Sequence, residues 1–238
     1  MELSIVIPAY NEEKRLGGTL STITEYAKKN FNDYEIIVVD DCSKDSTSLL
    51  ASNFEKVRVL RNEKNMGKGY SVKRGLLNAK FKYALFTDSD LATPIEEIEK
   101  FYEHMDKGYS IIIGSRNIEG SRVEIKQTKL RNMMGKVYPL LVKLLVINDF
   151  GETQCGFKLF ITEDAKKIVE YQTLNRFSFD VELLFIAKKH GYKTKEVPVI
   201  WRDQKGSKLN PYTDSFDMLW ELLKIKINSL LGKYKKRN

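Results

Sequence analysis

Short, continuous runs of apolar and β-branched residues alternate with longer amphipathic segments along the first half of the chain. Continuous apolarity is typical of strands that are covered on both faces of a sheet. The runs predict strands at residues 3–7, 34–41, 56–60, 83–87 and 109–115, and the segments between them predict helices at 12–29, 45–53, 68–79 and 95–107. This alternation predicts an α/β fold, with an open and mostly parallel sheet flanked by helices.

The pattern changes after residue 115. It predicts a polar loop at 116–128, a long helix at 130–146, a strand at 155–160, two further helical pieces, a strand at 193–201 and a final helix at 214–231. No linker rich in proline, glycine and serine separates the two halves of the sequence. We therefore expect a single domain over residues 1–238.

The composition narrows the class of protein. A net charge of +8 predicts an anionic partner, which is a nucleic acid, a nucleotide, a phospholipid surface or a phosphorylated substrate. The two cysteines lack CxxC spacing, so they predict neither a disulfide framework nor a zinc site and indicate a reducing compartment. The first residues do not resemble a signal peptide, and no apolar run approaches the roughly 18 residues of a spanning helix. Contact with a membrane is therefore expected only at its surface.

Pairs of carboxylates follow two of the predicted strands. Asp40 and Asp41 end the second strand, and Asp88 and Asp90 follow the fourth. The carboxyl ends of parallel strands meet at one edge of a sheet, where ligands bind. A pair at i and i+2 can hold one divalent cation, Mg²⁺ or Mn²⁺, together with water and phosphate oxygens. Alternatively, Asp88 caps the following helix and Asp90 is a solvated loop residue.

Two other segments point to a nucleotide. Lys68 opens a helix after Gly67, where backbone N–H groups, the helix dipole and the ammonium all favour phosphate, although the Walker spacing is absent. The first strand ends in Pro8, Tyr10 and Glu12, which suit a base and a ribose.

The segments SIVIPAYNEE, EIIVVDDCSKDST, NMGKG, FTDSDLATP and IIIGSR occur in the order and spacing of family 2 glycosyltransferases of the GT-A fold, and the chain resembles that family over nearly its whole length. Members transfer a sugar from a nucleotide diphosphate sugar. The segments ETQCGFKLF, RFSFDVELLF and GSKL are most similar to the dolichyl-phosphate glucosyltransferase branch, with dolichyl-phosphate mannose synthases as close relatives.

The resemblance implies a role for each motif. It implies a nucleotide pocket lined by Pro8, Tyr10, Glu12 and Asp41, with Asp40 beside them. Asp88 then lies nearest the nucleotide sugar and Asp90 holds the metal, although which of the two binds it directly stays open. Mannose synthases carry a further ligand, a glutamine, where this chain has Ala92. We therefore expect weak metal affinity in the absence of the donor.

The acceptor side is implied in the same way. Arg116 and Arg131 match arginines that related synthases direct at a lipid phosphate, a role that suits the bidentate guanidinium. Glu152 is either the general base for a hydroxyl acceptor, as in polysaccharide-making relatives, or an ion-pair partner that orients Arg131 or Lys158.

A later loop carries three further candidates. Arg202, Ser207 and Lys208 lie on a glycine-containing loop that either closes over the pyrophosphate or is a solvated basic loop.

Two basic segments bear on the membrane. Residues 125–148 hold five basic side chains and 224–238 hold six, both without an acidic one, and apolar residues are interleaved with them. Such helices suit an anionic membrane interface, although similar stripes also pack on a core. The resemblance assigns residues 1–115 to the nucleotide sugar, 116–212 to the acceptor and 213–238 to an amphipathic, basic helix and tail.

The expected function is an inverting transfer of glucose from UDP-glucose to dolichyl or another polyprenyl phosphate, with Mg²⁺ or Mn²⁺, at the cytoplasmic face of a membrane. A glycan hydroxyl acceptor and a mannose synthase that uses GDP-mannose are the alternatives. A nucleic-acid partner is not expected, because an RNP-type aromatic motif is missing. A dinucleotide oxidoreductase is disfavoured because GxGxxG does not follow the first strand.

Overall fold

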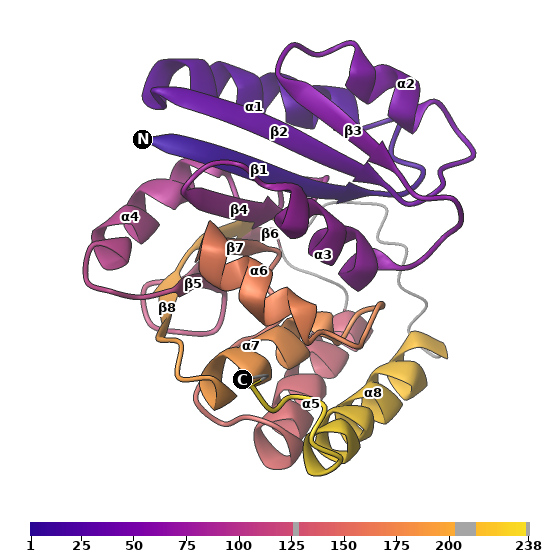
Figure 1. Ribbon diagram of the computed structural model, residues 1–238, viewed down its shortest axis with the longest axis vertical. Coiled ribbons are helices and arrows are strands. Elements are labelled where there is room, and N and C mark those ends of the chain that lie inside the picture. The colour runs from indigo at the N-terminus through magenta and orange to yellow at the C-terminus, as the bar shows by residue number, and fades with distance from the viewer. Residues whose placement is uncertain (126–128, 203–212, 237–238) are drawn as a thin grey trace.

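A central sheet of seven strands organises the computed structural model, which describes residues 1–125, 129–202 and 213–236 (Figure 1). Its strand order is β3-β2-β1-β4-β7-β5-β8, and a second, two-stranded sheet pairs β6 with β9. The strands are β1 (Glu2–Ala9), β2 (Asp33–Asp40), β3 (Val57–Arg61), β4 (Tyr83–Thr87), β5 (Ile111–Ser115), β6 (Arg122–Ile125), β7 (Phe157–Ile161), β8 (Thr194–Pro198) and β9 (Ile200–Arg202). In the large sheet β7 alone is antiparallel to its neighbours, so the predicted open and mostly parallel sheet is confirmed.

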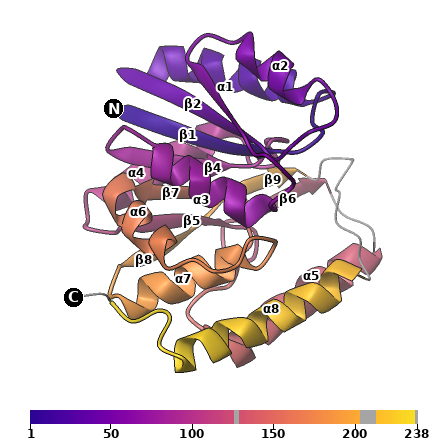
Figure 2. The same ribbon diagram turned by 45° about the vertical axis from the view of Figure 1, so that its right-hand side comes forward.

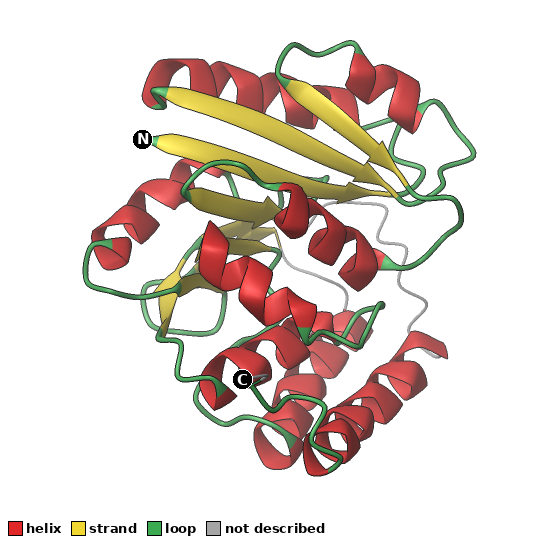
Figure 3. Cartoon of the chain, viewed as in Figure 1, coloured by secondary structure: helices red, strands yellow, loops and turns green. Residues whose placement is uncertain are grey.

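Helices cover both faces of the large sheet (Figure 3). They are α1 (Leu16–Asn30), α2 (Thr47–Ser52), α3 (Lys68–Asn78), the 3₁₀ helix η1 (Ile95–Ile98) that continues into α4 (Glu99–Met105), α5 (Lys129–Leu145), α6 (Thr162–Glu170), α7 (Phe179–Lys189) and α8 (Thr213–Leu230). One apolar cluster joins the sheet to α1, α2, η1 and α4, and the other joins it to α3, α5, α6, α7 and α8.

The continuous apolarity of the strands follows from this sandwich. Successive side chains of a strand point to opposite faces, so a strand covered on both sides must be apolar at every position. In β1, Ile5 and Ile7 belong to the cluster under α1, whereas Val6 between them belongs to the cluster under α3. The same division separates Ile36 from Ile37 in β2.

Three predicted elements differ in the structure. The first helix begins at Leu16 rather than at residue 12, and the N–H of Glu12 donates instead to Oγ1 of Thr47, the first residue of α2. The predicted loop at 116–128 contains β6, and the predicted strand at 193–201 is divided into β8 and β9. The division falls at Val199, whose N–H bonds to the carbonyl of Ser115 while its carbonyl accepts from Arg122. One segment therefore contributes an edge to each sheet.

The helices α5 and α8 contact each other and run side by side at the end of the molecule remote from β2 and β3 (Figure 2). Both are attached to the start of α7, because Tyr138 of α5 donates to Ser178 Oγ and Glu221 of α8 accepts the Ser178 N–H. Within the described residues, none of the helices combines the length and the apolarity needed to cross a bilayer.

A close approach of α3 to β1 gives a test of the packing. A Cβ built on Gly75 would lie 2.2 Å from Cγ1 of Val6, whereas a Cβ on Gly18, on the exposed side of α1, would meet nothing within 4 Å. Gly75→Ala should lower the free energy of unfolding by about 1–3 kcal/mol through overpacking, and Gly18→Ala should raise it by about 0.5–1 kcal/mol through helix propensity. Urea unfolding measures both, and equal effects of the two substitutions would contradict this packing.

Candidate active site

The carboxyl ends of β1, β2 and β4 meet at one edge of the sheet, where the predicted acidic residues lie. Because β7 is antiparallel to β4, its beginning reaches the same edge, and Gly156 accepts the N–H of Asp88 at 3.1 Å. The loops after β1, β2 and β4 and the start of α3 therefore meet beyond the carboxyl ends of the strands, the place at which open α/β sheets form the crevice for a ligand.

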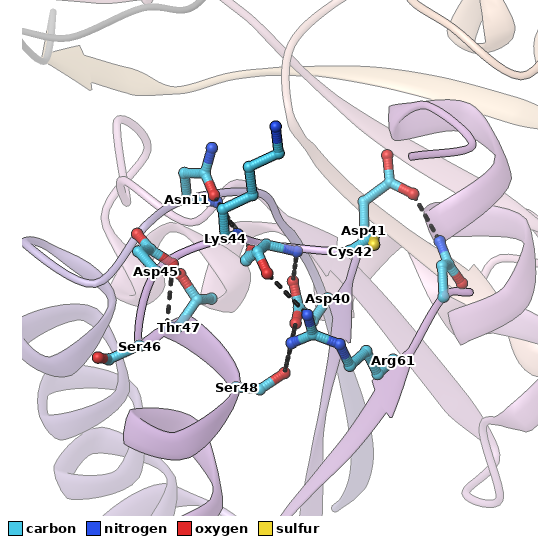
Figure 4. A network of polar contacts seen from close by, with 12 residues as sticks. Asn11, Asp40, Asp41, Cys42, Lys44, Asp45, Ser46, Thr47, Ser48 and Arg61 are labelled. Carbon is cyan, nitrogen blue, oxygen red and sulfur yellow. Dashed lines mark hydrogen bonds and ion pairs between the residues drawn. The ribbon is translucent and has the colours of Figure 1, made fainter. Parts of the chain in front are cut away.

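Asp40 is held by the protein itself (Figure 4). Its fully buried carboxylate accepts from the Ser43 N–H at 2.9 Å, from Arg61 Nη1 at 2.8 Å and from Ser48 Oγ. Arg61 also donates to the Ser43 carbonyl at 2.7 Å. These bonds fix the loop from β2 to α2, and a direct contact of Asp40 with a nucleotide stays a prediction.

Asp41 fixes the loop that leads into α3. Its carboxylate accepts from Asn62 Nδ2 at 2.7 Å and from the N–H groups of Met66 and Gly67, both at 2.8 Å. Gly67 has a φ of 99°, and a Cβ there would lie 2.4 Å from the Asn175 carbonyl oxygen. Through these bonds, Asp41 fixes the segment NMGKG and with it the position of the first turn of α3.

The loops after β1 and β2 are bonded together. The Asn11 N–H donates to Ser43 Oγ at 2.8 Å, and Asn11 Oδ1 accepts the Lys44 N–H at 2.7 Å. Pro8 is buried at the end of β1, and Tyr10 is half-buried beyond it. The predicted base and ribose contacts therefore lie next to the loop that Asp40 holds.

Asp88 lies against the backbone of β7 and is paired with a cation. Lys68 Nζ is 2.7 Å from Asp88 Oδ1, and a Cβ added at Gly156 would lie 2.0 Å from Asp88 Oδ2. Pro94, not Asp88, occupies the cap position before η1, so the alternative in which Asp88 caps the following helix is wrong. Burial alone would lower the pKa of the Lys68 ammonium, but Asp88 and Asp180 outweigh it and raise that pKa.

Asp90 is more weakly compensated than Asp88. Its Oδ1 accepts the Ala92 N–H at 3.1 Å, and Arg15 Nη1 lies 3.9 Å from its Oδ2. Burial, and then the charge of Asp88, raise the pKa of Asp90. Arg15 also donates to Glu12, with Nη2 at 2.8 Å from Oε1, and so joins the loops after β1 and β4.

These groups fit a hard divalent cation that is completed by substrate. Asp88 and Asp90 offer only oxygen atoms, and burial together with the charge of Asp88 raises the pKa of Asp90, which a bound cation would oppose. In the described part of the chain, no group of three or more histidine, cysteine or acidic residues is arranged to hold a metal. Mg²⁺ commonly takes one or two carboxylates and completes its shell with phosphate and water. The predicted divalent ion is therefore compatible with this crevice and stays a prediction.

A buried ion pair supports the floor of the crevice. Lys158 of β7 is 1% exposed and donates to Asp180 of α7 and, at 2.6 Å, to the Cys155 carbonyl. The ammonium groups of Lys68 and Lys158 lie 5.4 and 5.6 Å from the centre of the Phe86 ring. Burial raises the pKa of Asp180, and Lys158 opposes that rise. Sequence reasoning missed Asp180, although an acidic residue in the apolar helix FDVELLF was the available signal.

Glu152 is bound by Arg116. The side chain of Glu152 is 2% exposed, and Oε2 accepts from the Arg116 N–H at 2.9 Å and from Nε at 2.8 Å, while Nη2 donates to Oε1. Burial favours the neutral acid, but Arg116 outweighs it and lowers the pKa of Glu152. The predicted partners of this glutamate were Arg131 or Lys158. The structure pairs Glu152 with Arg116, and Lys158 is paired with Asp180 instead, so the Lys158 alternative is wrong. The side chain of Arg131 lies outside the described residues, so a pairing of Arg131 with Glu152 stays a prediction.

Two residues that the sequence did not single out hold this pair in place. Glu196 of β8 accepts the N–H groups of Gly151 and Glu152, each at 2.9 Å, and so fixes the loop before β7. The guanidinium carbon of Arg116 lies 4.9 Å from the centre of the Trp201 ring. Both residues come from the segment KTKEVPVIW. Its pattern predicts a strand but does not indicate a contact with residues 116 and 152.

Of the other predicted site residues, only Arg202 has a described side chain. The Arg202 N–H donates to the Ala92 carbonyl at 2.8 Å, which brings β9 beside the Asp90 loop, but its side chain is exposed and pairs with Glu124. Ser207 and Lys208 lie outside the described residues. Arg131 lies on α5, and its side chain is likewise outside the described part.

Comparison with known proteins gives a family and a fold. The sequence model named Glycosyl transferase family 2 matches residues 4–166. A dolichyl-phosphate beta-glucosyltransferase of Dictyostelium discoideum is 36% identical over 249 residues, which cover 98% of this chain and 76% of the relative. The dolichyl-phosphate beta-glucosyltransferase of Homo sapiens is 34% identical over 251 residues, with 98% and 78% covered.

Solved structures agree in fold at lower identity. Glucosyl-3-phosphoglycerate synthase from Mycobacterium tuberculosis in complex with UDP has a TM-score of 0.70 at 18% identity, covering 100% of this chain and 81% of that one. The same enzyme in complex with Mn²⁺, UDP and phosphoglyceric acid has a TM-score of 0.69 at 18% identity, with 100% and 80% covered. The likeness shows that the fold is of the GT-A type, as predicted.

The contact between Asp88 and Gly156 can be tested by a double-mutant cycle. Gly156→Ala puts a methyl group on the Asp88 carboxylate, so it should lower the free energy of unfolding by roughly 1–3 kcal/mol. In an Asp88→Ala background the obstructing atoms are gone, and the same substitution should cost much less. An equal cost of Gly156→Ala in both backgrounds, measured by urea unfolding, would mean that the carboxylate does not lie there.

Proposed function

The chain belongs to glycosyl transferase family 2 and is a glycosyltransferase, and on this basis we propose that it transfers glucose from UDP-glucose to dolichyl or another polyprenyl phosphate. Relatives that are 34–36% identical over 98% of the chain are named for glucose transfer to this class of acceptor, which favours glucose over mannose. The structural neighbour in complex with UDP supports a uridine nucleotide as the donor.

The ion pair between Arg116 and Glu152 is the observation that favours a phosphate acceptor over a hydroxyl acceptor. A sugar hydroxyl needs a general base with a pKa near the working pH. Glu152 is 2% exposed, is bound by Arg116 through both carboxylate oxygens, and has a lowered pKa, so it is a poor base. A phosphate monoester has a second pKa of about 6 and is already an anionic nucleophile at neutral pH. The site therefore favours a phosphate acceptor over a glycan hydroxyl.

Arg116 is suited to hold that phosphate. Its Nε and Nη2 donate to Glu152, one face of the guanidinium lies over Trp201, and 26% of the side chain is exposed. We assign Nη1 and the exposed edge to the acceptor phosphate, because Arg forms strong charge-assisted bonds to phosphate oxygens. Arg131 is proposed as a second acceptor arginine.

The reaction is a single displacement with inversion. An acceptor phosphate oxygen forms a bond to the anomeric carbon of glucose while the bond from that carbon to the diphosphate breaks, and the electron pair leaves with UDP. Lys68, at the amino end of α3, holds the diphosphate together with the helix dipole. Mg²⁺ or Mn²⁺, held by Asp88 and Asp90, would neutralise charge on the leaving diphosphate.

The donor occupies the crevice between the loops after β1 and β2. We assign the base and ribose to Pro8, Tyr10, Glu12 and Asp41, with Asp40 as the support of the loop beside them. Arg202, Ser207 and Lys208 are proposed to cover the pyrophosphate.

The assay for this function uses labelled UDP-glucose or GDP-mannose with dolichyl phosphate, with and without Mn²⁺. Label should become extractable into organic solvent only with UDP-glucose and Mn²⁺. In the same assay Glu152→Gln should raise the KM for dolichyl phosphate and keep kcat within about tenfold, because the amide still bonds Arg116 and no base is removed.

Two outcomes would contradict the proposal. Label transferred only from GDP-mannose would replace the donor. A loss of kcat of about 10²–10⁴ in Glu152→Gln, with loss of the acidic limb of the pH–rate profile, would make Glu152 a base and the acceptor a hydroxyl.

Exposed apolar side chains on α5 and α8, together called the apolar face, support contact with a membrane, which we propose to be at its cytoplasmic surface. The apolar face consists of Val137, Leu140 and Leu144 of α5 and Phe216, Trp220, Leu223, Ile227 and Leu230 of α8. The α8 positions follow a spacing of three and four residues, so they form one stripe. Leu144 is 81% exposed and Leu230 88% exposed. A soluble surface rarely gathers so many large apolar side chains without a partner.

Charge beside the apolar face favours an anionic bilayer. Lys143 lies in the last turn of α5, and Lys224 and Lys226 are exposed on α8. Of the acidic residues described on α8, Asp217 is paired with Arg176 and Glu221 is buried against Ser178. Amphipathic helices with basic flanks bind anionic membranes through both effects.

Vesicle sedimentation tests the apolar face. Wild-type protein should bind vesicles that contain phosphatidylserine, and the double variant Leu144→Glu with Leu230→Glu should bind at least about tenfold more weakly, because both side chains leave water on binding. Leu49→Glu changes a side chain of α2 that is 67% exposed and should have no effect. Equal binding of all three proteins, or none by the wild type, would exclude this face.

A further inference from the structure

The two carboxylates of the FTDSD segment are compensated by cations of the chain itself. Lys68 Nζ lies 2.7 Å from Asp88 Oδ1, and Arg15 Nη1 lies 3.9 Å from Asp90 Oδ2. The shorter separation is within hydrogen-bond distance, whereas the longer one is a Coulombic contact only. Asp88 is therefore the carboxylate from which a bound cation would have to displace an existing partner.

The position of Lys68 is built into the fold. A Cβ added at Gly69 would lie 2.6 Å from Cβ of Phe179, and one added at Gly67 would lie 2.4 Å from the Asn175 carbonyl oxygen. The first turn of α3 is thus pressed against the segment that begins α7. The Phe86 ring lies 5.4 Å from Nζ. The backbone position from which Lys68 reaches Asp88 is consequently fixed by the fold, while its side chain stays partly exposed.

A divalent cation and the Lys68 ammonium compete for Asp88. Two positive groups a few ångströms apart repel strongly in a partly buried site. The next carboxylate, Asp180, is already bound by Lys158 and is therefore a poor replacement partner for Lys68. A diphosphate at the amino end of α3 offers Lys68 new oxygen partners and releases Asp88.

We infer that Lys68 couples the two halves of donor binding: it is the counter-ion of Asp88 until a nucleoside diphosphate arrives, and then moves to the diphosphate so that Asp88 can bind the divalent ion. This inference rests on the proposed function, because it takes the donor to be a nucleoside diphosphate sugar. It makes Lys68 a group that opposes metal binding in the absence of the nucleotide and no longer opposes it once the nucleotide is bound.

Titration of the full chain with Mn²⁺, with and without UDP, tests the coupling through the free Mn²⁺ signal in electron paramagnetic resonance. Lys68→Met should bind Mn²⁺ about tenfold more tightly than wild type without UDP, because a partly buried ion pair no longer opposes the metal. Its affinity for UDP should fall by about tenfold, because a charge-assisted bond is lost. Once UDP is bound, Asp88 is free for the metal in both proteins, so the enhancement of Mn²⁺ affinity by UDP should fall by about tenfold, and reciprocity requires the same fall in the enhancement of UDP affinity by Mn²⁺.

Two variants control for charge and shape. Lys73→Met removes the same charge from the same helix, but its ammonium donates to the Gln172 carbonyl at 3.1 Å rather than to Asp88, so the enhancement should stay as in wild type. Lys68→Arg keeps a cation beside Asp88 and should preserve weak Mn²⁺ binding without UDP. Circular dichroism and thermal unfolding check that each variant is folded.

The outcomes separate this inference from the function on which it rests. If Mn²⁺ affinity without UDP is unchanged or lower in Lys68→Met, the coupling role is wrong even where glucose transfer to dolichyl phosphate is observed. If the wild type binds neither Mn²⁺ with UDP nor UDP alone, both the coupling and the proposed donor are overturned. Tighter Mn²⁺ binding in Lys73→Met as well would reduce the effect to net charge and also refute the coupling.

Discussion

Charge compensation in a partly buried crevice is the constraint on which the rest of this structure depends. A parallel sheet brings the ends of β1, β2 and β4 to one edge, and the sequence places carboxylates at each of those ends. Carboxylates that are crowded and desolvated destabilise the fold unless cations or hydrogen-bond donors face them. The compensating pairs are Arg61 with Asp40, Lys68 with Asp88, Arg15 with Glu12, Arg116 with Glu152 and Lys158 with Asp180.

Asp40, Asp41 and Asp88 all follow strand ends in the sequence, but they differ in the kind of partner that binds them. Asp40 and Asp41 each accept backbone N–H groups of the adjacent loops, which cannot leave without unfolding those loops, and Asp40 is paired with Arg61 in addition. Asp88 is met by an ammonium on a long, flexible side chain that can turn to another anion. The first two therefore build the walls of the crevice, whereas Asp88 is the one that can exchange its partner for a ligand.

The sequence predicts the large sheet, the family and the identity of most crevice residues, because strand periodicity and motif order are local signals. It does not predict which charged side chains form ion pairs with each other. Arg116 and Glu152 are 36 positions apart, and their meeting depends on β7 running antiparallel between β4 and β5. The roles of Glu196 and Trp201 stay hidden for the same reason, and β6 with β9 was missed because a polar edge pair of 4 and 3 residues has little apolar periodicity.

The pair of Arg116 and Glu152 is a costly way to stabilise a protein. Removing two charges from water costs several kcal/mol, and a well-packed apolar pair of similar volume is often at least as stable. The further bonds from Glu196 and the Trp201 ring hold the guanidinium in one orientation, with part of its side chain still exposed. Such an arrangement adds little to stability but prepares a fixed positive charge for an anion that reaches the crevice. An acceptor that brings its own negative charge needs a fixed cation more than it needs a base, and in the proposed reaction the buried glutamate would serve to hold that cation without taking a proton.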